Sequence, residues 1–106
     1  MSERLKRPFR KVLQPDLFKA LGDPTRSDIF AILVTKAEPV NVTEVWEGMG
    51  KSCAFRNVSH HLRILKNAGL ASHIRRGKEM LYWANNQVFR DALSSIIEGI
   101  PLSEDE

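Results

Sequence analysis

The sequence has little of several things that would place it in a specialised class. Its 106 residues include a single cysteine, Cys53, so a disulfide within the chain is excluded and a reducing compartment, the cytoplasm, is expected. No stretch approaches the roughly 18 apolar residues that a membrane-spanning helix requires. A charged and then apolar leader is also missing. We therefore expect a protein with no membrane association, and its length favours one domain.

Acidic residues are absent from a long central segment. Between Glu47 and Glu79 there is no aspartate or glutamate, while basic residues recur throughout: Lys51, Arg56, Arg63, Lys66, Arg75, Arg76 and Lys78. The formal net charge of +3 therefore understates the local positive charge. A segregated positive surface is typical of proteins that bind polyanions, although a solvated face without a partner has the same composition. Motifs have to decide between the two.

Charge also separates the ends of the chain from its middle. Residues 1–13 are basic and lack an apolar period, so we expect an N-terminal arm there. Residues 101–106 end in Glu104, Asp105 and Glu106 and are expected to form an acidic tail. The globular domain is therefore predicted to span residues 14–100.

Cap residues predict two helices near the start of this domain. Pro15 opens a short helix that ends at Gly22. Asp23 is a good N-cap, and Pro24 suits the first helical position, where its missing N–H costs nothing. The second helix has apolar residues at helical spacing, namely Ile29, Phe30, Ile32 and Leu33.

Two further helices are predicted between Pro39 and Gly69. Asn41 followed by Glu44 resembles a capping box, which predicts the start of a short third helix. Glycines at 48 and 50 end it. Ser52 is a candidate cap for a fourth helix that runs to Gly69.

After Gly69 the apolar period changes. The stretch "LASHIRRGKEMLYW" contains two short runs around Arg76-Gly77-Lys78, and Gly77 can take the positive φ that a tight hairpin requires. A last helix, roughly 87–99, carries an apolar stripe. The predicted order is α-α-α-α-β-β-α, mainly α with a small β-hairpin (α+β). This is the outline of a winged helix-turn-helix.

The fourth helix carries two stripes at helical spacing. One is largely apolar and must face the core: Val58, His61, Leu62 and Leu65. The other is polar and basic: Arg56, Ser59, His60 and Arg63, extended by Asn67. Arginine can bond guanine bidentately, and serine and histidine can reach phosphates or base edges in a major groove. With the basic hairpin tip, this stripe predicts DNA contacts from Arg56, Asn57, Ser59, His60, Arg63, Lys66, Arg75, Arg76 and Lys78.

The histidines are weak evidence for a metal or catalytic site. His60 and His61 are adjacent on a helix and point about 100° apart, so they cannot chelate one ion. His61, at the edge of the buried stripe, is expected to be hydrogen-bonded within the fold. His73 has no obvious partner. Ser59 has no nearby carboxylate to orient either imidazole as a base, so an enzyme is not expected.

The last helix predicts self-association. It presents Phe89, Ala92, Leu93, Ile96 and Ile97, with Ile100 following, in a domain that already has a core. An exposed stripe of this size usually marks an interface, and a two-fold dimer is the commonest closed arrangement. The alternative is that the helix packs only on its own domain.

Two stretches carry a family resemblance, "LFKALGDPTRSDIFAIL" (17–33) and "VSHHLRILKNAGLASHIRRGKEMLYW" (58–83). They resemble the ArsR/SmtB family of winged-helix repressors. The resemblance implies a homodimeric bacterial or archaeal repressor that binds an inverted-repeat operator in double-stranded DNA and releases it when an inducer arrives. It also implies that the helix with Ser59, His60 and Arg63 is the recognition helix. First and last helices would form the dimer interface, through Leu17, Phe18, Phe89, Leu93, Ile96, Ile97 and Ile100.

The chain departs from the family in its metal-sensing signatures. Val45, Trp46 and Glu47 stand where a Cys-x-Cys pair is expected, and the last helix has no histidine. A soft metal needs several thiolate or imidazole ligands, so neither a metal nor another cofactor is predicted. A metal-responsive variant of the repressor, with a site shared between subunits, is one alternative. Cys53 lies among basic residues that favour the thiolate, so a thiol switch there is a hypothesis beside an inert cysteine. A winged-helix module that binds protein is the other alternative. The inducer is unknown.

Overall fold

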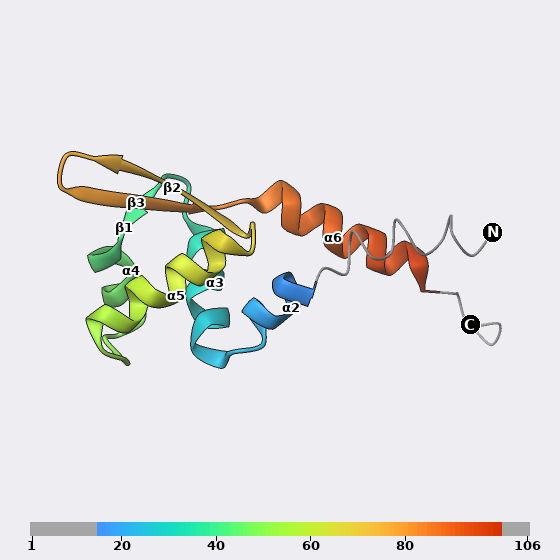
Figure 1. Ribbon diagram of the computed structural model, residues 1–106, viewed down its shortest axis with the longest axis horizontal. Helices are drawn as coiled ribbons and strands as arrows, with labels where there is room; N and C mark the ends of the chain where they lie inside the picture. Colours follow the sequence, from blue (N-terminus) through green and yellow to red (C-terminus); the bar gives the residue numbers. More distant parts are fainter. Residues whose placement is uncertain (1–14, 101–106) are drawn as a thin grey trace.

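The computed structural model describes residues 15–100, which fold into five helices and three strands (Figure 1). The helices are α2 (Pro15–Leu21), α3 (Pro24–Thr35), α4 (Val42–Gly48), α5 (Phe55–Asn67) and α6 (Asn86–Gly99). The strands are β1 (Val40–Asn41), β2 (Ala71–Arg76) and β3 (Glu79–Ala84). The predicted fold class, mainly helical with a small sheet, is confirmed. The expected arm (1–13) and tail (101–106) lie outside the described residues.

Side-chain caps start α3 and α4 as predicted. The Asp23 carboxylate accepts a hydrogen bond from the Arg26 backbone N–H at 2.9 Å, and Pro24 follows at the first helical position. Asn41 and Glu44 form a reciprocal capping box, with distances of 2.8 Å and 2.9 Å. The Asn41 amide also donates to the Glu79 carboxylate at 2.6 Å. This single asparagine therefore joins the start of α4 to the start of β3.

The sheet contains one strand more than predicted. Its order is β1-β3-β2, antiparallel throughout, with Val40 opposite Tyr82 and Asn41 opposite Leu81. β1 has only two residues, too few for an alternating pattern to appear in the sequence. The β2–β3 hairpin is confirmed, and Gly77 at its turn has φ +64°. β1 ties the chain entering α4 to the base of this hairpin.

The core lies where α3, α4 and α5 meet the hairpin. Its fully buried side chains are Ile29, Leu33, Val45, Val58, Leu62, Leu65 and Leu70. Three of these come from α5, and they confirm the predicted apolar stripe of that helix. Burial of each such aliphatic side chain stabilises the fold by about 1.5 to 3 kcal/mol. The core therefore fixes how α5 is rotated about its own axis.

The start of α5 differs from prediction, whereas its end lies at Gly69 as expected. Ser52 does not cap the helix, which begins at Phe55 with Ala54 in the cap position and no side-chain cap bond. The preceding residues form a turn instead, with Gly50 at φ +68° and Lys51 at φ +56°. At its other end α5 closes in a Schellman motif: Leu70 N–H donates to the Leu65 carbonyl and Gly69 N–H to that of Lys66, each at 3.0 Å.

Candidate nucleic-acid interface

The polar stripe of α5 faces away from the core. Five of its predicted DNA-contacting residues are exposed in the chain: Arg56, Asn57, His60, Arg63 and Lys66. Ser59 is half-buried. Because Val58, Leu62 and Leu65 on the opposite side are completely buried, the helix cannot turn these groups inward without losing its core contacts. The stripe is an open surface of two guanidinium groups, an ammonium and an imidazole.

A second basic group lies at the tip of the hairpin. Arg75, Arg76 and Lys78 are all exposed there, with Glu79 as their acidic neighbour. The Glu79 carboxylate accepts the Asn41 hydrogen bond. Figure 1 places the hairpin tip and the beginning of α5 at the same end of the molecule, opposite the end reached by α6. The fold thus brings two of the basic clusters of the sequence to one end.

His61 is hydrogen-bonded within the fold, as predicted. Its Nδ1 accepts a hydrogen bond from Arg26 Nε at 3.3 Å, so this nitrogen carries no proton. Burial lowers the pKa of His61 below its usual value of 6.5, against the opposing attraction of the Asp23 carboxylate. The His60 and His61 ring centroids are 5.8 Å apart and the rings are tilted. Arg26 is distant from His61 in the chain, so no spacing rule could mark it as the partner.

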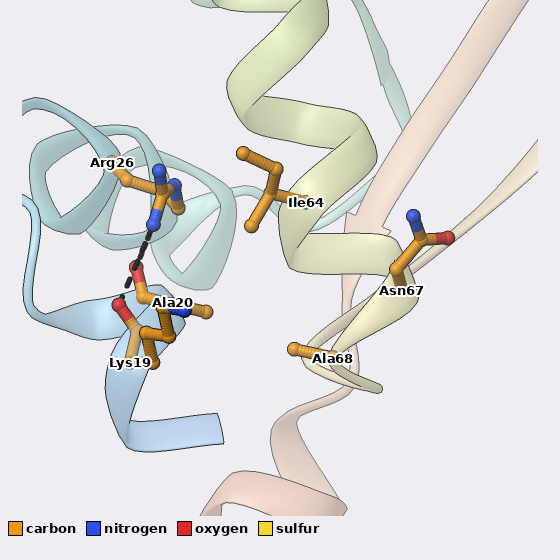
Figure 2. A pocket seen from close by; sticks show the side chains of 6 residues that line it. All are labelled: Lys19, Ala20, Arg26, Ile64, Asn67 and Ala68. Carbon is orange, nitrogen blue, oxygen red and sulfur yellow. Dashed lines mark hydrogen bonds between the residues drawn. The ribbon is translucent and has the colours of Figure 1, made fainter. Parts of the chain in front are cut away.

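Arg26 also borders a cavity of about 280 Å³ between α2, α3 and the end of α5 (Figure 2). Lys19, Ala20, Ile64, Asn67 and Ala68 line the rest of it. The Arg26 Nη1 donates to the carbonyl of Ala20 at 3.0 Å and more weakly to that of Lys19 at 3.5 Å. With its Nε bonded to His61, this guanidinium joins three helices. Its role is structural, and the sequence did not single it out.

The other candidate groups are scattered. His73 lies beside Tyr82, with ring centroids 5.5 Å apart, and its Nδ1 is buried without a hydrogen-bond partner among residues 15–100. The Cys53 thiol is free and half-buried. Within that same range no three His, Cys, Asp or Glu side chains gather in a way that could hold a metal ion. None of the helices described there is long and apolar enough to cross a membrane.

An aromatic cluster at the α4–α5 turn was missed from the sequence. Trp46 donates its indole N–H to the Cys53 carbonyl at 2.8 Å. The Phe55 ring meets it edge-on, with centroids 5.4 Å apart, and the Lys51 ammonium lies 5.0 Å from the Trp46 ring centroid. The available signal in the sequence is a turn with two glycines between two aromatic residues, a pattern that by itself predicts only a helix boundary.

The apolar stripe of α6 is largely uncovered within the chain. Phe89 packs edge-on against Phe30 at 5.0 Å, and Ala92 is buried. Beyond them Leu93 is 42% exposed, Ile97 67% and Ile100 59%, while Ile96 is half-buried. Of the expected α2 contributors, Phe18 is 40% exposed, but Leu17 is buried in the chain's own core. Leu17 therefore has little surface left for a partner.

Comparison with known proteins agrees with this architecture. A family of helix-turn-helix domains matches residues 21–74. The transcriptional repressor SdpR of Bacillus subtilis is 33% identical over 85 residues, 80% of this chain and 90% of SdpR. A homolog of the cadmium resistance regulatory protein CadC from Staphylococcus aureus is 41% identical over 66 residues, 62% of this chain and 52% of the homolog.

Solved structures give the same fold. A homodimeric winged helix-turn-helix DNA-binding domain from Mycobacterium bovis, a possible ArsR-family regulator, superposes with a TM-score of 0.63 at 23% identity. The match covers 84% of this chain and 81% of that domain. The helix-turn-helix family match and the likeness to SdpR, together with this fold, place the chain among winged helix-turn-helix transcriptional regulators rather than among enzymes. Within that class, the chain belongs to the ArsR/SmtB family.

Proposed function

We propose that the protein is a cytoplasmic transcriptional repressor that binds an inverted-repeat DNA operator as a homodimer and is released by an inducer. The observation that carries this proposal is the outward polar stripe of α5, fixed in rotation by a fully buried opposite face. An α-helix with such a stripe fits the major groove of B-DNA, about 12 Å wide. The relative SdpR is itself named a repressor, which supports the direction of regulation.

Two kinds of DNA contact are proposed. The α5 residues Arg56, Asn57, Ser59, His60, Arg63 and Lys66 would contact base edges and nearby phosphates. The hairpin residues Arg75, Arg76 and Lys78 would follow a phosphate backbone or enter a minor groove, as cations at a wing tip can. The first set would give sequence specificity, and the second would give affinity that depends on salt.

A dimer would bury the exposed side of α6. An apolar surface whose exposure to water is unfavourable is formed by Leu93, Ile97 and Ile100. The proposed interface would also include the adjoining Phe18, Phe89 and Ile96. The homodimeric state of the Mycobacterium bovis domain supports this arrangement. Two copies related by a two-fold axis would present their recognition helices to successive major grooves about 34 Å apart.

The direct test is selection of bound sequences from random double-stranded DNA, followed by gel-shift titration against unrelated competitor DNA. We expect an inverted repeat to be selected and to resist competition. Light scattering at micromolar concentration should give the mass of a dimer. A protein that selects no sequence is not a specific repressor, and the alternative of a protein-binding winged-helix module would then stand. Alkylation of Cys53 in the same titration tests the thiol-switch hypothesis, which unchanged affinity would exclude.

A further inference from the structure

Phe55 is a large apolar residue that is partly exposed at the start of α5. It is the first residue of α5, and it is 42% exposed. In helix-turn-helix proteins the N-terminal residues of the recognition helix contact base edges. A large apolar group left partly in water at that position has surface that a partner could cover. It lies beside Arg56, an exposed residue of the polar stripe.

The Phe55 ring is held in place from behind. Trp46 meets its edge at 5.4 Å with an interplanar angle of 85°, a favourable aromatic arrangement. Trp46 is itself fixed by the hydrogen bond to the Cys53 carbonyl and by the Lys51 ammonium near its ring. A ring that already packs against a fixed neighbour loses less conformational entropy on binding than a free one.

Phe55 also borders open space. A hollow of about 270 Å³ lies between the start of α4 and the hairpin tip, and Phe55 forms part of its wall. Val42 and Thr43 line it from α4, and Lys78, Glu79 and Met80 line it from the hairpin. The ring therefore borders the gap between the recognition helix and the wing, on the basic end of the molecule.

We infer that Phe55 recognises the 5-methyl group of a thymine in each half-site. Thymine is the only base whose major-groove edge presents a methyl group, and phenylalanine is among the residues that contact it. The apolar contact would distinguish thymine from bases without a methyl group, in addition to the hydrogen bonds that Arg56 and Arg63 can donate to bases. This inference rests on the proposed DNA-binding function and deepens it, because it names a base type and the residue that recognises it.

The test replaces thymine by uracil, which removes only the methyl group. The probe is the duplex that the wild-type protein selects from random DNA, with each thymine of the half-site changed to deoxyuridine in turn. At one position per half-site we expect binding to weaken about fourfold, the value for one buried methylene-sized group. Phe55→Ala should bind the thymine and uracil duplexes equally at that position. Ile74→Ala, which removes another exposed apolar side chain (53%) from the hairpin, should keep the wild-type preference.

The outcomes separate this inference from the proposed function. A protein that selects a site but is indifferent to every uracil substitution overturns the role of Phe55 and leaves the repressor intact. A Phe55→Ala variant with the wild-type thymine preference overturns it as well. If Phe55→Ala does not fold, Phe55→Leu serves instead and should reduce the preference. The uracil scan on wild-type protein needs no variant. Failure to select any site would remove the proposed function itself.

Discussion

The two longest helices, α5 and α6, are both amphipathic, but their apolar sides have different surroundings. α5 buries its apolar side completely inside the chain and leaves a polar, basic side in solvent. In α6 only Ala92 is buried, and Leu93, Ile97 and Ile100 on its apolar side are largely in solvent. Amphipathicity therefore predicts that a face will be covered, but not by what. In α5 the chain itself covers the apolar face. In α6 the proposed dimer would supply the cover.

The largest effect should follow from truncating the buried face of α5. Leu62→Ala leaves a cavity in the core and should lower the free energy of unfolding by about 2 to 5 kcal/mol. Leu93→Ala is the matched change on α6, where the side chain is 42% exposed, and should cost much less within one chain. Urea denaturation of both variants at equal protein concentration measures the difference. Equal losses would mean that α6 is as much part of the core as α5.

A charge on the α6 stripe should separate the proposed dimer. Ile97→Glu would place two carboxylates against an apolar surface and should raise the dimer dissociation constant roughly a hundredfold, since apolar burial is lost on both copies. Gln87→Glu is the control, because Gln87 is exposed on the polar side of α6, where it donates a hydrogen bond to Asp91. Sedimentation equilibrium gives both constants. A dimer unaffected by Ile97→Glu would place the interface on another surface.

The exposed side of α5 should matter for DNA and little for stability. Arg63→Ala is expected to weaken binding to the selected site by about 1 to 3 kcal/mol and to relax specificity at one base pair. Arg76→Ala, on the hairpin, should weaken binding to all DNA sequences alike. It should also reduce the slope of log affinity against log salt concentration by the equivalent of about one phosphate contact. Titrations at several salt concentrations with specific and unrelated DNA distinguish the two. Wild-type affinity in Arg63→Ala would mean that another face of α5 meets the duplex.

The smallest effect should be a pH dependence that His61 adds on the inner side of α5. Its pKa is lowered in the folded state by burial, with Arg26 and His60 adding to the decrease and Asp23 opposing it. As pH falls through about 6.5, the unfolded chain gains a proton that folded His61 does not, so the free energy of unfolding decreases. His61→Gln should flatten this decrease between about pH 7.5 and 5.5. The free energy of unfolding is measured by urea denaturation at each pH. If it changes equally with pH in the wild type and in His61→Gln, other groups cause the pH dependence.

Sequence periodicity predicted long elements well and short ones poorly. The 13 residues of α5 repeat their apolar positions often enough to define a buried side. The Asp23 cap, the Asn41 capping box and the hairpin glycine marked other boundaries. β1 could not be predicted because its two residues become a strand only by pairing with β3. Ser52 is not a cap because the segment around it forms the turn whose Cys53 carbonyl binds Trp46.

The candidate site divides in the same way. Exposure of the basic residues on α5 and the hairpin followed from local spacing and composition. The contacts of Arg26 with His61 and of Trp46 with Phe55 depend on how separate segments pack, and no spacing rule marks them. Leu17 was predicted to lie in the dimer interface but is buried in the core of its own chain. On a short helix, an apolar residue can face either surface, and spacing does not decide between them.

Asn41 has a consequence for how this end of the molecule moves. One side chain accepts the hydrogen bond that begins α4 and donates the one that holds Glu79 at the start of β3. Its amide group cannot rotate to follow the hairpin without releasing the backbone of α4. A tilt of the hairpin is therefore expected to disturb the first turn of α4, because one side chain holds both. The hairpin and the start of α4 are joined through this single residue.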